Sequence, residues 1–486
     1  MSLRRGFGLL MCGAALSLAQ SPGFTETGNM TVAREFHTAT LLPNGKVLIA
    51  GGLSFGQGPQ TVWASAELYD PPTGTFMLTG DMTTPRANHT ATLLPDGKVL
   101  LAGGSLQASA ELYDPASGTF SATGAPSWSH QTATLLNTGK VLVTGGPMQT
   151  AELYDPSTGS FSPTGDMTEP GADTATLLTD GKVLITRSTQ FFEENHAELY
   201  DPTTGTFTRI GDIIVTDPAQ FPNTTPGQNP SSILLTNGTV LIAGGAQGDF
   251  WATGAQLYDP STGSFRITGQ LTAGIGYWQA AALLPEGKVL IAGESPGVPC
   301  DGVTHIGPPI DATCPGAAEL YDPVTGTFSA PFLSLSEEGH KATLLPDGTL
   351  LLSGGFRCCG VTIAGAEIYH PAVLLPSPVL ISRPESTNGA ILHGSNHQIV
   401  SAENPALGGE AIEIYGSGLI AGAVIPPQVT IDGQMAEVLY FGLAPGYPGL
   451  NQINVRVPNG IPSTATAPVR LNYLGRPSNE VTLAVR

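Results

Sequence analysis

The chain repeats one sequence pattern seven times, and this repetition constrains its fold more than any other feature. HTATLLPNGKVLIAGG starts at His37 and HTATLLPDGKVLLAGG starts at His89. Each copy has an apolar segment, a two-residue turn, a second apolar segment, a variable loop, a third segment with Tyr, and a turn before a segment that begins with Phe. The Gly that ends the first turn supplies the positive φ of tight hairpins. The pattern predicts seven units of four β-strands.

The seventh unit lacks its fourth segment, because Tyr369 is followed by HPA instead of a turn and a Phe. Near the N-terminus, PGFTETGNM at residues 22–30 matches fourth segments such as GSFSPTGDM. We predict that this segment completes the seventh unit and closes a ring without an open sheet edge. Circular stacking of like units would bury both faces of each one. Residues 20–376 are therefore predicted to form an all-β, seven-bladed β-propeller.

Gly pairs such as Gly51-Gly52 and Gly103-Gly104, each followed by a loop and a strand with Tyr, resemble kelch repeats over residues 22–375. The chain departs from that pattern at Thr186-Arg187 and Gly293-Glu294, and Phe replaces the usual Trp of the fourth strand. The resemblance implies that the predicted propeller is a kelch β-propeller.

Residues 377–486 carry short strand-like runs such as EAIEIYG and NQINVRVP without the repeat. These runs predict an immunoglobulin-like β-sandwich. The segment from GSGL to SNEVTLAV resembles TIG-type domains and a C-terminal domain that recurs in secreted bacterial proteins. This resemblance implies a secreted or cell-envelope setting and no particular reaction.

Residues 1–19 have the pattern of a cleaved signal peptide, with Arg4 and Arg5, an apolar stretch and a Ser17-Leu18-Ala19 cleavage site. The route, general or twin-arginine export, stays open. We predict a secreted, periplasmic or cell-surface protein without a transmembrane segment, because no other stretch approaches the roughly 18 apolar residues of a spanning helix. The formal net charge of −20 would repel nucleic acids.

Four cysteines remain after Cys12 is removed with the signal peptide, an even number that suits an oxidising compartment. We predict that Cys300 and Cys314 pair within one loop. The adjacent residues Cys358 and Cys359 could form only a strained bond with each other, so a pairing with a neighbouring loop stays open.

A kelch propeller followed by an immunoglobulin-like domain is also the layout of the galactose oxidase family. This resemblance implies a Tyr-His pair of copper ligands at the start of an inner strand, where the chain has Gly339 and His340. A further ligand is expected from the C-terminal domain, where His393 and His397 have no matching context. We therefore expect no metal and no other cofactor.

Histidines recur before the inner strands and could form a ring around the channel, although a hydrogen bond to the neighbouring blade is the favoured interpretation. The predicted ring residues are His37, His89, His130 and His340. The repeated Glu of the third segment is interpreted in the same way, as part of the blade structure.

Function is expected on the face with the variable loops, because residues that break a repeat serve a ligand more often than the scaffold. No motif of a nucleophile, a metalloprotease or a nucleotide site appears. The predicted function is a non-catalytic binding module for a neutral polysaccharide or a protein surface. The alternatives are a carbohydrate-active enzyme, a galactose oxidase-like oxidoreductase and a structural or adhesive envelope protein. The candidate ligand residues are Trp63, Arg86, Trp128, Phe192, Trp251, Tyr277 and Trp278.

Overall fold

The structure of the protein is a computed structural model of the full chain. It describes residues 22–486 with gaps at 56–59, 105–107, 130–131, 147–148, 188–195, 214–229, 245, 248–249, 252, 273–274, 276–278, 294–315, 331, 335–338, 358–360 and 385. The elements among these residues are β-strands, so the all-β prediction is confirmed. None of the described residues belongs to a helix long and apolar enough to cross a membrane.

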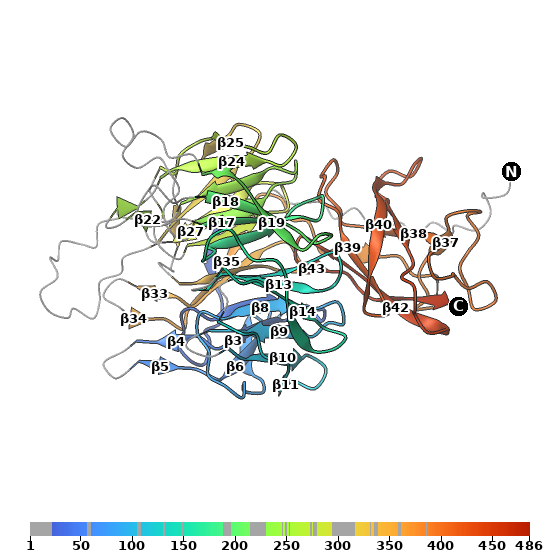
Figure 1. Ribbon diagram of the computed structural model, residues 1–486, viewed down its shortest axis with the longest axis horizontal. Helices are drawn as coiled ribbons and strands as arrows, with labels where there is room; N and C mark the ends of the chain where they lie inside the picture. Colours follow the sequence, from blue (N-terminus) through green and yellow to red (C-terminus); the bar gives the residue numbers. More distant parts are fainter. Residues whose placement is uncertain are drawn as a thin grey trace, which may run out of the picture.

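Seven four-stranded antiparallel sheets form the blades of a propeller, as the repeat predicts (Figure 1). From the inner to the outer strand, blades 1 to 3 are β2 (Thr38–Leu41), β3 (Val47–Ala50), β6 (Ala66–Asp70) and β7 (Thr75–Leu78); β8 (Thr90–Leu93), β9 (Val99–Ala102), β10 (Ala110–Asp114) and β11 (Thr119–Ala122); and β12 (Thr132–Leu135), β13 (Val141–Thr144), β14 (Glu152–Asp155) and β15 (Ser160–Pro163).

Blades 4 to 6 follow the same order. They are β16 (Thr174–Leu177), β17 (Val183–Arg187), β18 (His196–Asp201) and β19 (Thr206–Asp212); β20 (Ser231–Leu234), β21 (Val240–Ala243), β24 (Ala255–Asp259) and β25 (Ser264–Ile267); and β26 (Ala280–Leu283), β27 (Val289–Gly293), β28 (Gly316–Asp322) and β29 (Thr327–Phe328), with β30 (Phe332–Ser334) also on β28.

Blade 7 consists of β31 (Lys341–Leu344), β32 (Leu350–Ser353), β35 (Ala366–His370) and, as its outer strand, the N-terminal β1 (Gly23–Glu26). The two last strands are antiparallel, with Phe24 opposite Tyr369 and ring centroids 5.2 Å apart. The predicted closure of the ring by the N-terminus is therefore confirmed.

The third strand of each blade carries a buried Tyr, and in five blades the structure shows its hydroxyl joined to a Thr of the neighbouring blade. The Tyr69 hydroxyl lies 2.9 Å from Thr27 Oγ1, and the Tyr113 hydroxyl lies 3.0 Å from Thr79 Oγ1. Each ring also packs on the Phe of its own outer strand, with centroids 4.8 Å apart for Tyr69 and Phe76. Phe therefore takes the packing position in the fourth strand, and repeated contacts worth about 1 kcal/mol each hold the blades together.

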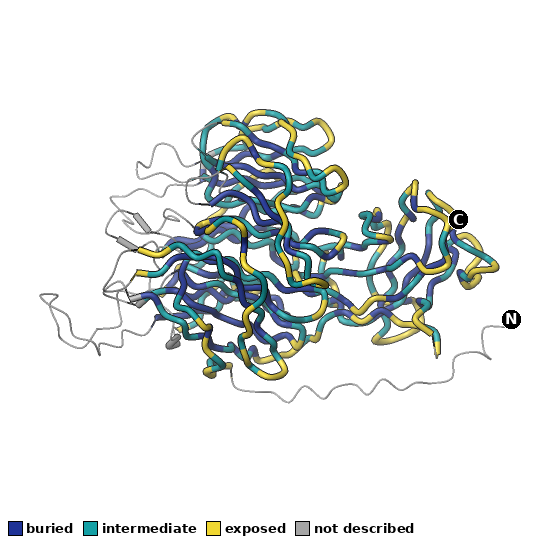
Figure 2. Tube along the Cα trace, turned by 90° about the horizontal axis from the view of Figure 1, so that it is seen from below, coloured by how far each residue is buried: buried dark blue, intermediate teal, exposed yellow. Residues whose placement is uncertain are grey.

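The propeller has two unlike faces. The turn face carries the hairpin turns between the first and second and between the third and fourth strands. The loop face carries the remaining connections, among them three short two-stranded ribbons, and Figure 2 shows that buried residues follow the strands between the two faces. The ribbons are β4 (Leu53–Ser54) with β5 (Thr61–Val62), β22 (Ala246–Gln247) with β23 (Phe250–Trp251), and β33 (Phe356–Arg357) with β34 (Val361–Thr362).

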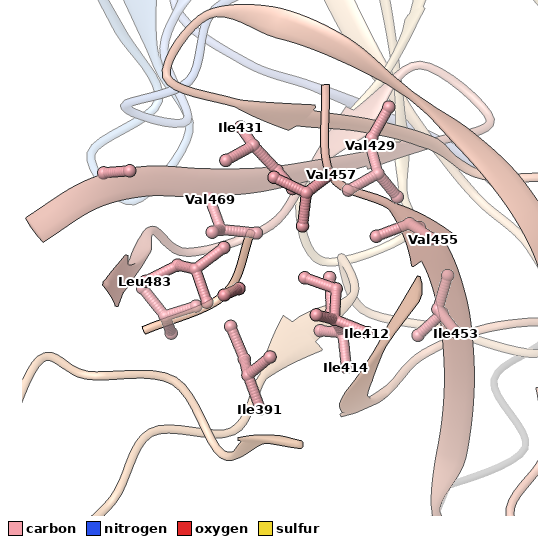
Figure 3. Close-up of a cluster of buried hydrophobic side chains, with 14 of the residues drawn as sticks. Ile391, Ile412, Ile414, Val429, Ile431, Ile453, Val455, Val457, Val469 and Leu483 are labelled. Atoms are coloured by element: carbon pink, nitrogen blue, oxygen red, sulfur yellow. The ribbon is translucent and has the colours of Figure 1, made fainter. Parts of the chain in front are cut away.

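The C-terminal domain is one curled sheet of nine strands. These strands are β36 (Val379–Leu380), β37 (Ile391–His393), β38 (Ala411–Ser417), β39 (Gln428–Ile431), β40 (Gln434–Leu443), β41 (Asn451–Arg456), β42 (Thr464–Tyr473), β43 (Arg476–Pro477) and β44 (Val481–Val485). The first residues of β40 pair with β39 and its later residues pair with β41, so β40 joins the two halves of the sheet. Apolar side chains of both halves, such as Ile414, Val429 and Val469, meet in one core (Figure 3).

The C-terminal domain covers part of the turn face. The Val424 amide donates to the Thr236 carbonyl at 2.9 Å, and the Ser377 amide donates to the Pro346 carbonyl at 2.6 Å. The β42–β43 hairpin shares two cavities with residues that end the inner strands of four blades. Those residues are Leu93, Leu135, Leu177 and Leu234. The hairpin therefore lies at the turn end of the central channel (Figure 1).

Candidate functional site

At the loop end of the channel, the residues directly before the repeat His form a narrow collar. The collar consists of Phe36, Asn88 and Gly339, which have φ values of 52°, 54° and 67°. The Phe36 amide donates to the Gly339 carbonyl at 3.4 Å, and the Asn88 amide donates to the Phe36 carbonyl at 3.0 Å. A left-handed Phe is a strained residue, and such strain gathers at functional sites. The collar also explains Gly339, because its position demands the left-handed conformation.

The repeat histidines pack against the Gly pair of the preceding blade. A Cβ on Gly51 would lie 2.9 Å from His89 Cε1, and a Cβ on Gly354 would lie 2.7 Å from His37 Cε1. His37 Nε2 lies 3.0 Å from Ser353 Oγ in blade 7, which precedes blade 1 around the ring. His89 Nε2 lies 3.0 Å from Thr38 Oγ1 in blade 1.

One member of the predicted ring is misplaced by the sequence reasoning. Strand β12 begins at Thr132 with the same register as β2 from Thr38, so the residue equivalent to His37 in blade 3 is Gln131. His130 precedes it, at the position of the collar. This assignment of Gln131 and His130 comes from the sequence alignment of the repeats, because residues 130–131 lie outside the described residues.

Three histidines and a lysine form an axial cluster below the collar: His37, His89, His340 and Lys341. Burial lowers the pKa of His37 well below its ordinary value, and the charges of Arg34 and Lys341 lower it further. Burial, reinforced by Lys341, lowers the pKa of both His89 and His340 to about 3. The three imidazoles are therefore neutral at pH 7, and burial also lowers the pKa of Lys341.

Several polar atoms of this region are buried without a hydrogen-bond partner in the described protein. They are Nδ1 of His37 and His89, both ring nitrogens of His340, Oε1 of Gln279 and Oγ1 of Thr343. Unpartnered buried polar atoms are rare in native proteins, and water or a ligand usually satisfies them. These buried atoms are uncharged donors and acceptors that water inside the channel could satisfy.

Glu35 lies beside the collar and was missed by the sequence reasoning. Its side chain is buried next to Gly339, and burial raises its pKa to about 7, opposed by a 3.4 Å hydrogen bond that Thr362 donates. The sequence did carry a signal for Glu35, because the type of residue at this position of the repeat differs widely from blade to blade. That position holds Glu35, Ala87, Ser129, Gly171, Gln228, Tyr277 and Glu338.

Two of the predicted tryptophans are placed on the loop face. Trp128 is 42% exposed and occupies the repeat position that Arg34 and Arg86 occupy in blades 1 and 2. Trp63 is half-buried, and its indole Nε1 has no hydrogen-bond partner among the described residues. Phe55, 45% exposed, lies on the same face. These rings offer apolar surface around the collar.

Arg86 is placed inside the scaffold, where its guanidinium is not available to a ligand. It is 1% exposed, lies 3.0 Å from the Glu111 carboxylate, and donates to the carbonyls of Gly103 and Ser109. Arg34 makes the same set of contacts with Glu67 at 2.7 Å in blade 1. Arg86 therefore has the same structural role as Arg34. Its position in a loop of the sequence suggested an exposed side chain, so the prediction of a ligand contact was wrong.

The other predicted residues are only partly described. Trp251 belongs to the β23 ribbon strand on the loop face. The residues outside the described part are Phe192, Tyr277, Trp278, Cys300, Cys314, Cys358 and Cys359.

The described residues do not fit the copper site that the galactose oxidase resemblance implies. Gly339 has no side chain for a ligand, and no group of three His, Cys, Asp or Glu in the described residues could hold a metal ion. His393 lies 2.6 Å from Glu410 and His397 lies 3.1 Å from Glu413. Both contacts are within the C-terminal domain, on or next to β37, which lies away from the propeller (Figure 1).

No family model and no curated protein match the chain. Among solved structures it is similar to a fungal alcohol oxidase of the AA5 family, described as having catalytic diversity and solved in complex with copper. The TM-score is 0.56 and the sequence identity is 17%, over 96% of this chain and 99% of the oxidase chain. The chain therefore has a galactose oxidase-like fold, a seven-bladed propeller with a curled β-sheet domain.

Proposed function

We propose that the protein is a non-catalytic binding module whose loop face binds a neutral polysaccharide. The observation that carries the proposal is the loop face, which bears the exposed rings of Trp128 and Phe55. We further propose that it works outside the cytoplasm, secreted, in the periplasm or on the cell surface.

The chemistry of both partners supports this ligand class. A Trp ring stacks on the apolar face of a sugar, and its N–H can bond a hydroxyl. Neutral imidazole nitrogens can accept from or donate to hydroxyls without attracting ions. The net charge of −20 disfavours polyanionic polysaccharides. A protein surface that covers the tryptophans is the alternative ligand.

The test is retention on affinity gels that contain neutral or anionic polysaccharides. We expect wild-type protein to be retarded by a neutral polysaccharide, and Trp128→Ala to bind about tenfold more weakly with an unchanged melting temperature. Val324→Ala is the control, because Val324 is 92% exposed on the turn face. Free migration of the wild type in every gel would contradict the proposal, and a protein captured through Trp128 would favour the alternative.

An oxidoreductase is the second candidate, favoured by the likeness to the copper alcohol oxidase and by His340 at the channel end. The poor fit of the described residues to copper argues against it. Copper-loaded protein is expected to release no peroxide from alcohols or aldehydes. Peroxide release that His340→Asn abolishes would establish the oxidoreductase.

A further inference from the structure

A large cleft separates the turn face from the C-terminal domain, on the side opposite to the proposed polysaccharide face. Its volume is about 930 Å³, which lies within the usual range of small-molecule sites. Hairpin turns of blades 3 and 4 and the inner-strand end of blade 5 line one wall. Residues 424–428, β40 and the β42–β43 hairpin line the other.

The lining of this cleft is mostly apolar, with several uncharged polar side chains and little charge. The amides of Asn137, Gln428 and Asn472 and the hydroxyls of Thr138 and Thr179 face it, and none of these side chains hydrogen-bonds another group of the described protein. Glu437 is its one charged residue, and Arg456 Nε lies 2.8 Å from the Glu437 carboxylate. An anion would find no cationic side chain among the described lining residues, whereas hydroxyl groups would find both donors and acceptors.

A tyrosine stands at the rim of the cleft. The ladder between β40 and β41 shifts register between Val438 and Tyr440, so Leu439 and Tyr440 are both exposed, at 41% and 43%. A bulge of this kind re-aims side chains next to functional sites. The Tyr440 hydroxyl donates to the Leu443 carbonyl at 3.1 Å, which fixes the ring while leaving its face free.

The same surface continues across the outer face of the sheet. Tyr440 is opposite Asn454, which is in turn opposite Glu413, so the three side chains share one face. Tyr415 donates its hydroxyl to Glu413 at 3.0 Å, and Gln452 donates to Asn454 at 2.9 Å. A row of tyrosine, amide and carboxylate groups therefore leads away from the cleft.

We propose that this cleft is a second ligand site, for a neutral saccharide chain that stacks on Tyr440 and bonds the amides of Asn137 and Asn472. Both domains supply the cleft with apolar side chains for the faces of the sugar rings and with uncharged amides or hydroxyls for their hydroxyl groups, and the sheet face accepts the part of the chain that extends beyond the cleft. A ligand that bridges the two domains would also fix their orientation. The observations that support this site are independent of those that support the loop face.

Neutral hexasaccharides of glucose, mannose and xylose, offered to the full-length protein, test the proposal. Two readouts separate the faces. None of the four tryptophans of the sequence lies in the C-terminal domain, and Trp63, Trp128 and Trp251 lie on the loop face, so a change in Trp fluorescence reports loop-face binding. Protection of Tyr440 from nitration reports binding in the cleft. We expect at least one hexasaccharide to protect Tyr440, in the wild type and in Trp128→Ala alike.

Variants of Tyr440 sharpen the test. Tyr440→Ala should weaken binding about tenfold without lowering the melting temperature, and Tyr440→Phe, which keeps the stacking surface, should bind nearly as well as the wild type. Leu407→Ala, an equally exposed apolar position of the same domain, should have no effect.

Three outcomes would overturn the proposal. In the first, no hexasaccharide slows the nitration of Tyr440. In the second, saccharides change only Trp fluorescence, which would leave the proposed loop-face function intact. In the third, the wild type is a dimer that Tyr440→Ala dissociates, which would make the cleft an interface between copies. Protection of Tyr440 without a fluorescence change would support the cleft and count against the loop face.

Discussion

Ion pairs recur at both ends of the propeller, but water reaches only those of the turn face. There, a Lys after the first turn pairs with the Asp before the second turn, as in Lys140 and Asp155, 3.1 Å apart with side chains 42% and 28% exposed. At the loop end, Arg34 with Glu67 and Arg86 with Glu111 are almost completely buried. The turn face thus repeats the same exposed ion pair in several blades, whereas the loop end combines buried ion pairs with side chains that differ from blade to blade.

The two ends also differ in what covers them. The C-terminal domain occupies part of the turn face and places its β42–β43 hairpin at the channel. The loop end carries the strained collar, the axial cluster and Glu35. The turn face, whose turns are alike, is therefore suited to docking a domain. The loop face, whose residues differ between blades, is suited to recognising a ligand.

The comparison depends on a closed ring, and the largest effect is expected when the ring is opened. Removal of residues 22–30 deletes β1, the packing of Phe24 on Tyr369 and the link from Thr27 to Tyr69. The free energy of unfolding should fall by about 5 kcal/mol or more, and the exposed edge of β35 should promote aggregation. Urea unfolding and size-exclusion chromatography measure both. A truncated monomer as stable as the full chain would show that another segment closes blade 7.

The second prediction contrasts the buried and exposed ion pairs. Arg86→Ala leaves the Glu111 carboxylate buried without its partner, and the free energy of unfolding should fall by about 3–5 kcal/mol. Lys140→Ala breaks an exposed pair and should change it by about 1 kcal/mol or less. Equal losses of unfolding free energy for the two variants in urea would contradict the proposed difference between buried and exposed ion pairs.

The third prediction uses pH at the axial cluster. The pKa of His340 is about 3 in the folded protein, below the ordinary value of 6.5, so the unfolded chain binds protons more readily between these values. Stability from the neutral imidazole is therefore present above pH 6.5 and is lost as pH falls toward 3, by an amount on the order of 3 kcal/mol. His340→Asn should flatten this dependence.

The control for the pH experiment is Val324→Ala, which removes no titratable group from a position that is 92% exposed. This variant should leave the acid dependence of stability close to that of the wild type. Identical pH profiles for the wild type and His340→Asn would mean that water reaches the axial cluster freely.

The smallest effect is expected from a pair of glycines. Gly51 and Gly263 have φ values of 64° and 66°, so an alanine at either position is strained by about 1 kcal/mol. Only at Gly51 would the new Cβ also meet the His89 ring and the Arg86 carbonyl, whereas at Gly263 it meets nothing within 4 Å. Gly51→Ala should destabilise the protein by about 1–2 kcal/mol more than Gly263→Ala in thermal unfolding. Equal losses of stability in the two variants would mean that the His89 ring does not pack against Gly51.

The candidate site was predictable only in its location. Variation among the loops pointed to the loop face, and the repeat marked His37, His89 and His340 as belonging to it. Arg86 looked available because a basic residue in a loop is usually solvated, but its contacts with Glu111 and two carbonyls bury it. Glu35 escaped notice although its repeat position varies between blades, because only the folded chain buries its carboxyl group beside Gly339.

The sequence by itself determined the number of blades, their strand order and the closure by β1, because a repeat encodes the same local contacts seven times. The turn glycines and the paired Tyr and Phe lie within each unit, and the Gly beside a His joins neighbouring units. All recur at fixed spacing, so they can be read along the chain. The tertiary structure alone decided that the C-terminal domain docks on the turn face, that β40 joins two halves of one sheet, and that a cleft remains between the domains. Those features rest on contacts that occur once, and a contact made once leaves no periodic signal in the sequence.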